Sequence, residues 1–256
     1  MLLRCDLHNH SCLSPCGSLD QSPSGLAQLA KERGLDVVAL TDHHSARNTP
    51  AFAEACARVG LLGVYGLEVA TVEEVHCLAL FDTPDEALAF EQVLQPHLPA
   101  FPNNPEKLGD QPIVDADDNI LGFMPNYLGV ATDIPFSQLR PLIEGAGGVF
   151  YPAHVDRPAF SLLSQLGRIP EGTGPVLEVS RHADADTVDR LRSDGYAVVA
   201  ASDAHYPDTV ASAWAVVDAA DRTWPAIWEA MRARCITALH PLQATAAEKT
   251  STTPIT

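Results

Sequence analysis

The chain has 256 residues, 46% of them hydrophobic and 19% charged, and a formal net charge of −17. This composition favours one large α/β domain or barrel and argues against extensive disorder, and no apolar run approaches the roughly 20 residues of a membrane-spanning helix. Arg4 and Asp6 interrupt any signal-peptide core, so we expect a cytoplasmic protein without membrane contact. The acidic charge disfavours long nucleic acid as a partner, although clustered divalent cations would reverse the charge locally.

Branched apolar runs alternate with helical patterns, which is the signature of βα units around a mostly parallel sheet. A Thr at 83 before Pro84 predicts a helix N-cap, and Gly34 and Gly60 stand where helices commonly end. The expected strands are 2–7, 37–41, 62–67, 75–80, 149–153, 176–179 and 197–201. The expected helices are 24–33, 50–59, 84–94, 137–146, 160–166 and 186–194.

Residues 96–135 break this rhythm with seven prolines and a polar segment, and we interpret them as an insertion within one domain, 1–242. The tip of the insertion, 114–121, predicts a hairpin turn between two short strands. A calcium loop is the alternative for Asp115, Asp117 and Asn119, but the glycine and the distal glutamate of that pattern are missing. Residues 243–256 are polar and rich in Thr, which predicts a flexible tail.

Histidines and carboxylates gather at the ends of the expected strands. A lone histidine would be an ordinary core or surface residue, but this set is different because the carboxyl ends of parallel barrel strands converge on one face. Imidazoles combined with carboxylates suit Zn, Mn or Fe rather than Ca or Mg. The sequence therefore predicts a multinuclear metal site built from His8, His10, His43, Glu68, His76, His154, Asp203 and His205.

Five short motifs resemble those of one family. They are Asp6-Leu-His-Asn-His10, Thr41-Asp-His-His44, Gly66-Leu-Glu68 followed by His76, Pro152-Ala-His154 and Ser202-Asp-Ala-His205. In this order they resemble the motifs of the polymerase and histidinol phosphatase (PHP) superfamily, over roughly residues 6 to 205. The resemblance implies a distorted (β/α)7 TIM-like barrel that carries the inserted segment, and a metal-dependent phosphoesterase.

The resemblance also implies two or three divalent ions (Zn, Mn or Fe). Glu68 would bridge two of them, the first held with His8, His10 and Asp203 and the second with His76 and His154. The third would use His43, His205 and a residue six positions after His10, where the family usually has His or Asp and this chain has Cys16. A thiolate can ligate zinc or iron, so we expect Cys16 to be a ligand. The alternative is an idle thiol, with Asp20 as a substitute ligand.

The implied reaction is the attack of a metal-bound water, positioned by Glu68, Asp203 and His205, on a phosphate ester. Four side chains near strand ends are candidate phosphate contacts, and the alternative for each is a solvated surface residue: Arg157, Arg181, His182 and His44. Asp6 and Asp42 precede candidate ligands and would either orient them or cap turns.

Two other functions stay open. Metal-dependent amidohydrolases also use barrels with histidine and carboxylate ligands, but no lysine stands at a mid-barrel strand end as a bridging ligand. A noncatalytic metal-binding module is the second alternative. The acidic surface favours a small phosphorylated metabolite or a short nucleotide as substrate. Six cysteines in a chain of this length are typical of reduced thiols.

Overall fold

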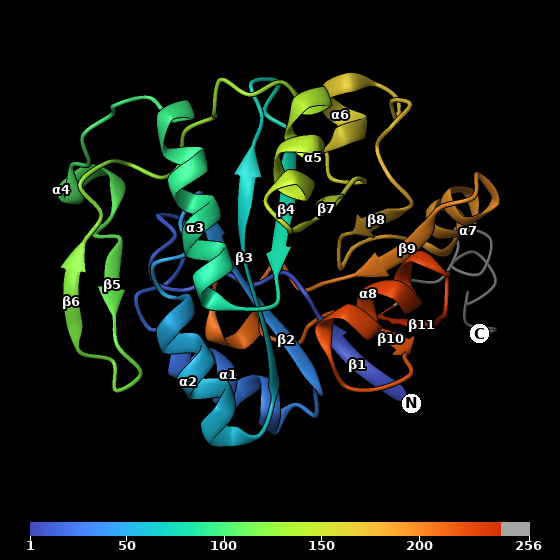
Figure 1. Cartoon of the computed structure of the whole chain (residues 1–256), viewed down its shortest axis with the longest axis horizontal. Coiled ribbons are helices and arrows are strands. Elements are labelled where there is room, and N and C mark those ends of the chain that lie inside the picture. The colour runs from blue at the N-terminus through green and yellow to red at the C-terminus, as the bar shows by residue number, and fades with distance from the viewer. Residues whose placement is uncertain (242–256) are drawn as a thin grey trace, which may run out of the picture.

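A curled sheet of seven strands forms the centre of the protein, as a computed structural model shows (Figure 1). The structure describes residues 1–241, so the expected tail at 243–256 lies outside the described residues. The sheet order is β11-β10-β1-β2-β3-β4-β7, and β1, β2 and β3 run parallel. The strands are β1 Leu2–Asp6, β2 Val37–His43, β3 Leu62–Ala70, β4 His76–Phe81, β7 Val149–Pro152, β10 Trp214–Asp218 and β11 Ile236–His240.

Two further strands, β8 Val176–Val179 and β9 Ala197–Ala200, pair in parallel and close the ring. On one side, the amide of Val155 after β7 donates to the carbonyl of Glu178 in β8. On the other side, the amide of Asp203 after β9 donates to the carbonyl of His8 after β1. The seven predicted strands thus curl around one interior, and the predicted fold class, a distorted TIM-like barrel, is confirmed.

Strand β4 departs from the regular pattern of βα units. A turn at 71–75 joins it to β3, and the two strands pair antiparallel, with Ala70 opposite His76. The expectation of a parallel strand with a helix before it is therefore wrong here. Because the direction is reversed, His76 at the start of β4 lies at the same rim as the end of β3.

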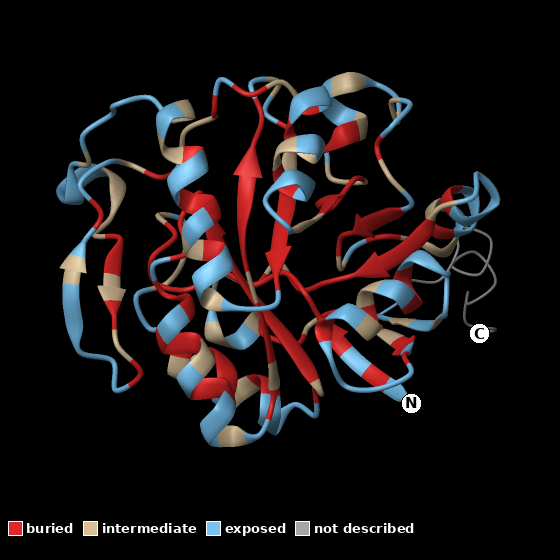
Figure 2. Ribbon diagram, in the orientation of Figure 1, coloured by how far each residue is buried: buried red, intermediate tan, exposed pale blue. Residues whose placement is uncertain are grey.

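Helices cover the outside of the sheet, so the strands between them are buried on both faces (Figure 2). The predicted cap at Thr83 is confirmed, because its hydroxyl accepts from the Glu86 amide in a capping box. Gly60 ends its helix with φ at 73°, a left-handed conformation that suits glycine. The helices are α1 Pro23–Glu32, α2 Thr49–Val59, α3 Pro84–Leu94, α5 Phe136–Gly145, α6 Leu162–Leu166, α7 Ala185–Ser193 and α8 Trp224–Arg232, with short 3₁₀ turns at Gln95–His97 and Pro207–Thr209.

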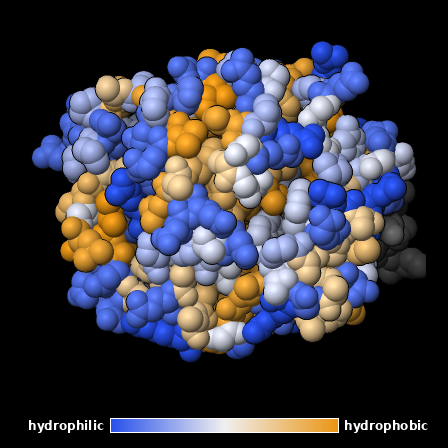
Figure 3. Space-filling model, viewed as in Figure 1, coloured by the Kyte–Doolittle hydropathy of each residue, from blue (hydrophilic) through white to orange (hydrophobic). Residues whose placement is uncertain are grey.

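The insertion at 96–135 carries a short helix, α4 Pro105–Leu108, and the expected hairpin, β5 Pro112–Val114 and β6 Ile120–Phe123. The Asp115 carboxylate accepts hydrogen bonds from the backbone amides of Asp117 and Asn119, so its oxygens stabilise the turn rather than a calcium loop. Apolar side chains of β6 are exposed, and Figure 3 shows hydrophobic colour at the left edge over this hairpin. Among residues 1–241, no helix has the length and hydropathy that a membrane span requires.

Candidate metal centre

Glu68, near the end of β3, is the hub of a buried cluster at the barrel rim. Its side chain is 1% exposed, so five imidazoles rather than water surround its charge. The nearest imidazole nitrogens lie 2.8, 3.0, 3.1, 3.3 and 3.4 Å from its oxygens, and they belong to His76, His154, His43, His10 and His8 respectively. A single carboxylate needs fewer than five imidazoles to balance its one negative charge. The arrangement therefore suits a carboxylate that would share cations with these imidazoles.

Asp203 completes the first half of this cluster. Its Oδ1 lies 3.4 Å from His8 Nε2 and 3.3 Å from His10 Nε2, and those two nitrogens are 3.1 Å apart. Oδ1 is buried and makes no hydrogen bond within the described chain, although two nitrogens approach it. Asp203 has φ at 47°, a conformation that is rare for a non-glycine residue and typical of functional sites. A buried carboxylate oxygen that lacks a hydrogen-bond partner and faces two imidazole nitrogens fits a cation between them.

Four sets of three side chains offer ligand atoms within 4.8 Å of one another. One of them consists of ligands that the resemblance implies for the first ion, and two others each combine Glu68 with one ligand implied for the second ion, His154 or His76. The two sets that contain His43 place it beside Glu68 and beside His205, where the third ion was expected. The sets are His8, His10 and Asp203; His8, Glu68 and His154; His43, Glu68 and His76; and His10, His43 and His205. The structure thus brings together eight of the nine expected ligands.

Cys16 is the ninth, and none of the four sets within residues 1–241 includes it. Its side chain is exposed and lines two hollows that adjoin the cluster. Desolvation, together with the charges of Glu68 and Asp203, raises the pKa of its thiol to about 12. The structure therefore places Cys16 at the rim of the centre. The third ligand atom close to His43 and His205 belongs to His10 instead of Cys16. None of the six cysteines is in a disulfide within the described chain.

Two acids hold the first imidazoles in position. Glu178 in β8 is fully buried, accepts from Nδ1 of His8 at 2.9 Å and accepts from the backbone amide of His154 at 3.1 Å. His10 Nδ1 lies 2.9 Å from the Ser14 hydroxyl, which donates to Asp42 at 2.6 Å. Both arrangements turn Nε2 of the histidine toward the cluster, as outer partners do in metal sites. Asp42 was expected beside the following histidine, His43, but acts on His10 through Ser14. Glu178 was not predicted, and its only signal in the sequence was a lone acid in an apolar strand.

Asp6 and His44 have other contacts than expected. Asp6 is fully buried and accepts from the amide and hydroxyl of Ser202, so it fixes the loop that carries Asp203 instead of orienting a histidine. His44 donates from Nδ1 to the Leu128 carbonyl and accepts at Nε2 from the Ala70 amide. Both its nitrogens are in use, so a phosphate contact by His44 is not supported.

The ionisable groups shift one another in opposite directions. Burial lowers the pKa of His8, but Glu178, Glu68 and Asp203 outweigh it and raise that pKa well above its usual value. Against the same burial, the nearby carboxylates of Asp203 and Glu68 raise the pKa of His10 to about 9. Burial and the charge of His10 lower the pKa of His205 to about 4 against the opposing charge of Asp203, so this imidazole is neutral near pH 7. Protons on His8 and His10 thus balance the negative charge of the carboxylates. A divalent ion would take over this role, because ligands must lose their protons to bind a metal.

A polar hollow of about 330 Å³ opens beside Asp203 and His205. Arg157, 41% exposed, places Nη1 2.5 Å from Asp203 Oδ2. Arg181 and His182 line the same hollow, and Arg181 Nε donates to His182 Nε2 at 3.2 Å. The structure therefore brings three of the four expected phosphate contacts together at the metal centre.

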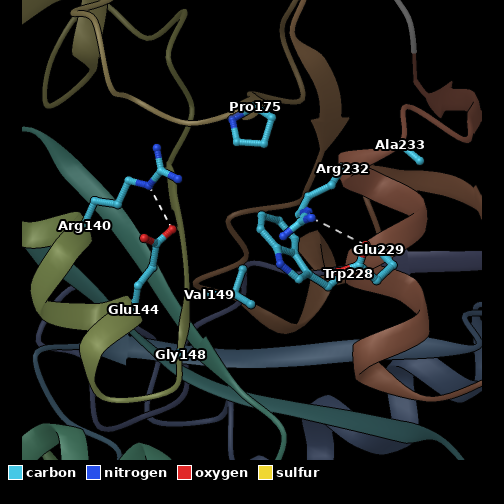
Figure 4. A pocket seen from close by; sticks show the side chains of 9 residues that line it. All are labelled: Arg140, Glu144, Gly148, Val149, Pro175, Trp228, Glu229, Arg232 and Ala233. Carbon is cyan, nitrogen blue, oxygen red and sulfur yellow. Dashed lines mark hydrogen bonds and ion pairs between the residues drawn. The ribbon is translucent and has the colours of Figure 1, made fainter.

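A wider hollow of about 740 Å³ lies at the other ends of β7 and β8, between α5 and α8 (Figure 4). Its two arginines already have partners, Arg140 on Glu144 at 2.8 Å and Arg232 on Glu229 at 3.6 Å. None of the candidate metal ligands lines it, and its charges are balanced, so we assign the chemistry to the rim with Glu68.

Glu178→Gln is expected to weaken metal binding about tenfold, in the range that substitutions behind metal ligands typically cause. Gln keeps the shape and the acceptor for His8, but loses the negative charge that makes Nε2 of His8 a stronger donor of its lone pair to a cation. Competition against a coloured chelator measures the affinity. Glu171→Gln, at an exposed position, is the matched control, and equal affinities in the two variants would contradict the role of Glu178.

Metal-dependent hydrolases use barrels that gather histidines and acids at one rim, and this structure has that arrangement. Residues 6–106 match the PHP domain family, and residues 189–235 match the PHP-associated family. The chain therefore carries a PHP domain and, after it, a PHP-associated segment. No curated protein matches its sequence.

Several solved structures share the fold. A lesion-specific endonuclease from Pyrococcus furiosus has a TM-score of 0.68 and 18% identity over 93% of this chain. A complex of Endonuclease Q with a 27-mer duplex has a TM-score of 0.65 and 20% identity over 91% of this chain. This chain spans only 58% and 57% of those two chains. A protein assigned as a metal-dependent phosphoesterase from Bifidobacterium adolescentis has a TM-score of 0.55 and 21% identity, over 78% of this chain and 87% of its own. An amidohydrolase from Chromobacterium violaceum with bound sulfate also has a TM-score of 0.55 and 21% identity, over 91% of this chain and 97% of its own.

Proposed function

We propose that this protein is a phosphoesterase that hydrolyses a small phosphorylated substrate with two or three divalent ions held at the barrel rim. The observation that carries the proposal is the contact of five imidazoles with Glu68, beside Asp203 and a cationic hollow. The donor set fits Zn, Mn or Fe, because it combines neutral imidazoles with carboxylates. His8, His10, Glu68 and Asp203 would hold one ion, Glu68, His76 and His154 a second, and His43 and His205 a third.

Such ions, when bound, lower the pKa of water into the neutral range and stabilise charge on phosphate oxygens. The chain itself supplies orientation and cationic contacts. Arg157 is within reach of both Asp203 and the polar hollow, where its guanidinium can bind two phosphate oxygens at once. His205 donates from Nδ1 to the Asp203 carbonyl, which leaves Nε2 of a neutral ring with a lone pair for a cation or a proton.

The choice between a small substrate and DNA depends on charge. Two of the similar structures are endonucleases, one of them bound to duplex DNA, but identities of 18% and 20% show the fold alone. A net charge of −17 repels a long polyanion, while a single phosphate enters a cleft where local charge is set by ions and Arg157. We therefore propose a phosphorylated metabolite or a short nucleotide.

Turnover assays under Zn²⁺, Mn²⁺ and Fe²⁺ test this function. We expect hydrolysis of a chromogenic phosphate monoester or a short phosphodiester, and weak or no cleavage of a duplex containing an abasic site. Cleavage of amides but no phosphate ester would favour an amidohydrolase. Bound metal without any turnover would favour the noncatalytic module, and either result would overturn the proposal.

Arg157→Ala is expected to raise KM for a phosphate ester roughly tenfold, because a charge-assisted contact to an anion contributes about 1.5–3 kcal/mol. The side chain is part-exposed, so stability should hardly change. Steady-state kinetics measures the effect. Arg168→Ala, at an exposed position outside the hollow, should match the unmodified protein. An unchanged KM in Arg157→Ala would remove this residue from the substrate site.

A further inference from the structure

The insertion builds one wall of a second hollow at the metal centre. This hollow, the insertion pocket, has a volume of about 260 Å³. Its floor includes His43 and His76, both candidate ligands, so anything bound there sits beside the ions. The wall is largely apolar and consists of Tyr127, Leu128, Val130 and, from the loop after β7, Phe160.

The wall is held in place by hydrogen bonds to its backbone. His44 Nδ1 donates to the Leu128 carbonyl at 2.8 Å, and the Leu128 amide donates to the Gln111 side chain at 2.7 Å. Beyond the wall, the Thr132 amide donates to the Ala70 carbonyl in β3 at 2.9 Å. These bonds tie residues 127–131 to the rim on both sides, so the pocket is formed before a ligand arrives.

Phe160 has the geometry of a binding residue. Its ring stacks on His76 with the centroids 5.0 Å apart and the planes at 22°. The residue is nevertheless 43% exposed, and its φ of 57° is rare for a large side chain. The His76 amide donates to its carbonyl at 3.0 Å, which fixes it there. An exposed apolar ring held in an unfavourable backbone conformation beside a candidate ligand is typical of a functional site.

The insertion pocket and the polar hollow beside Asp203, which Arg157 and Arg181 line, differ in chemistry and adjoin the same centre. Cys16 lines both, so they meet there, one side carrying Arg157 and Arg181 and the other carrying aromatic and aliphatic groups. We propose that the substrate is a phosphate ester whose alcohol carries a flat, largely apolar ring, with the ring in the insertion pocket and the phosphate toward Arg157. This inference rests on the proposed phosphoesterase function.

The lining of the pocket favours a ring over a polyol or a second phosphate. Both nitrogens of His44 already have backbone partners, so a sugar hydroxyl would find few donors. Glu74 also lines the pocket, and its carboxylate would repel a second anionic group. A ring gains from the burial of its apolar surface and from offset or edge contacts with Phe160 and Tyr127.

The test compares pairs of esters that share the reacting group and differ by the ring. The first pair is 2-phenylethyl phosphate and ethyl phosphate, and the second is a nucleoside 5′-monophosphate and ribose 5-phosphate. In the metal-loaded protein we expect kcat/KM to favour the ring-bearing ester of at least one pair roughly tenfold or more, as base and aromatic stacking would give. The pair with the larger ratio tells whether the ring is a simple aryl group or a nucleobase.

Variants then locate the ring. Phe160→Ala and Tyr127→Ala should each reduce the ratio toward one, and because the ratio compares two esters on the same variant, a general loss of activity cancels. Phe123→Ala, at a 54% exposed phenylalanine on the hairpin, should leave both activities and their ratio unchanged. Ratios near one in the unmodified protein, with all esters hydrolysed, would overturn this inference and leave the proposed function intact.

If no ester is hydrolysed, the proposed function is contradicted, and a second measurement then tests the insertion pocket by itself. Saturation-transfer NMR then reports binding of 2-phenylethanol and of a nucleoside, with ethanol and ribose as controls. We expect binding of at least one ring compound that Phe160→Ala abolishes. Absence of binding by every ring compound would overturn the pocket as well.

Discussion

Asp203→Asn is expected to lower kcat/KM for phosphate esters on the order of a thousandfold, because loss of a metal site removes several kcal/mol of charge stabilisation. Asn preserves the size of the side chain and tolerates the left-handed backbone at φ 47°. It loses the negative charge that lies 3.3 and 3.4 Å from His10 and His8. Its amide group also cannot pair with Arg157 as the carboxylate does.

The control is Asp208→Asn, which changes an exposed carboxylate on the same loop. Arg33 contacts only the backbone carbonyl of Asp208, so this variant should keep full activity. Circular dichroism and thermal unfolding establish that both variants fold. Near-normal turnover by folded Asp203→Asn would contradict the assignment of Asp203 as a ligand.

Chelation is expected to abolish hydrolysis and to lower the melting temperature. Bound ions stabilise the folded state by mass action, so removing a ligand present at 100 times its Kd costs about 2.7 kcal/mol of the free energy of unfolding. The charges of Glu68 and Asp203 would then be balanced by protons on His8 and His10 and by Arg157. Activity and thermal unfolding, measured before and after treatment with a chelator, check both expectations.

Adding back single ions distinguishes the metals. Zn²⁺, Mn²⁺ or Fe²⁺ should restore both activity and melting temperature, whereas Ca²⁺ should restore little because it prefers an all-oxygen shell. Dialysis without chelator is the control. Undiminished hydrolysis in a sample that elemental analysis shows to be free of transition metal would rule out the mechanism.

The sequence predicts the seven barrel strands well because their cores are local apolar runs, but strand direction is not a local property. The apolar run at 75–80 would look the same in a parallel and in an antiparallel strand. The short turn at 71–75 leaves room only for an antiparallel pairing with β3. The last elements, β10, α8 and β11, were not predicted at all. The strand at 214–218 adds antiparallel to β1 at the edge of the ring, a placement fixed by long-range pairing of Leu2 with Asp218.

The candidate ligands could be proposed from the sequence because all of them except His76, at the start of β4, stand at or just after the end of a strand, where fold geometry makes residues converge. The roles of their neighbours depend on contacts between distant segments. His44 follows His43 in sequence, yet its ring donates a hydrogen bond to the carbonyl of Leu128 in the insertion. Glu178 acts through His8, which lies 170 positions away in the chain. The resemblance to the PHP superfamily pointed to Cys16 as a ligand, and whether its thiol joins the third set stays a prediction.

The most direct test is a crystal structure grown with Mn²⁺ and phosphate, with the ions located by anomalous scattering. We predict peaks between His8, His10, Asp203 and Glu68 and between Glu68, His76 and His154, with phosphate bridging them on the side of Arg157. Manganese found only at surface carboxylates, with these imidazoles hydrogen-bonded to Glu68 as before, would contradict the account.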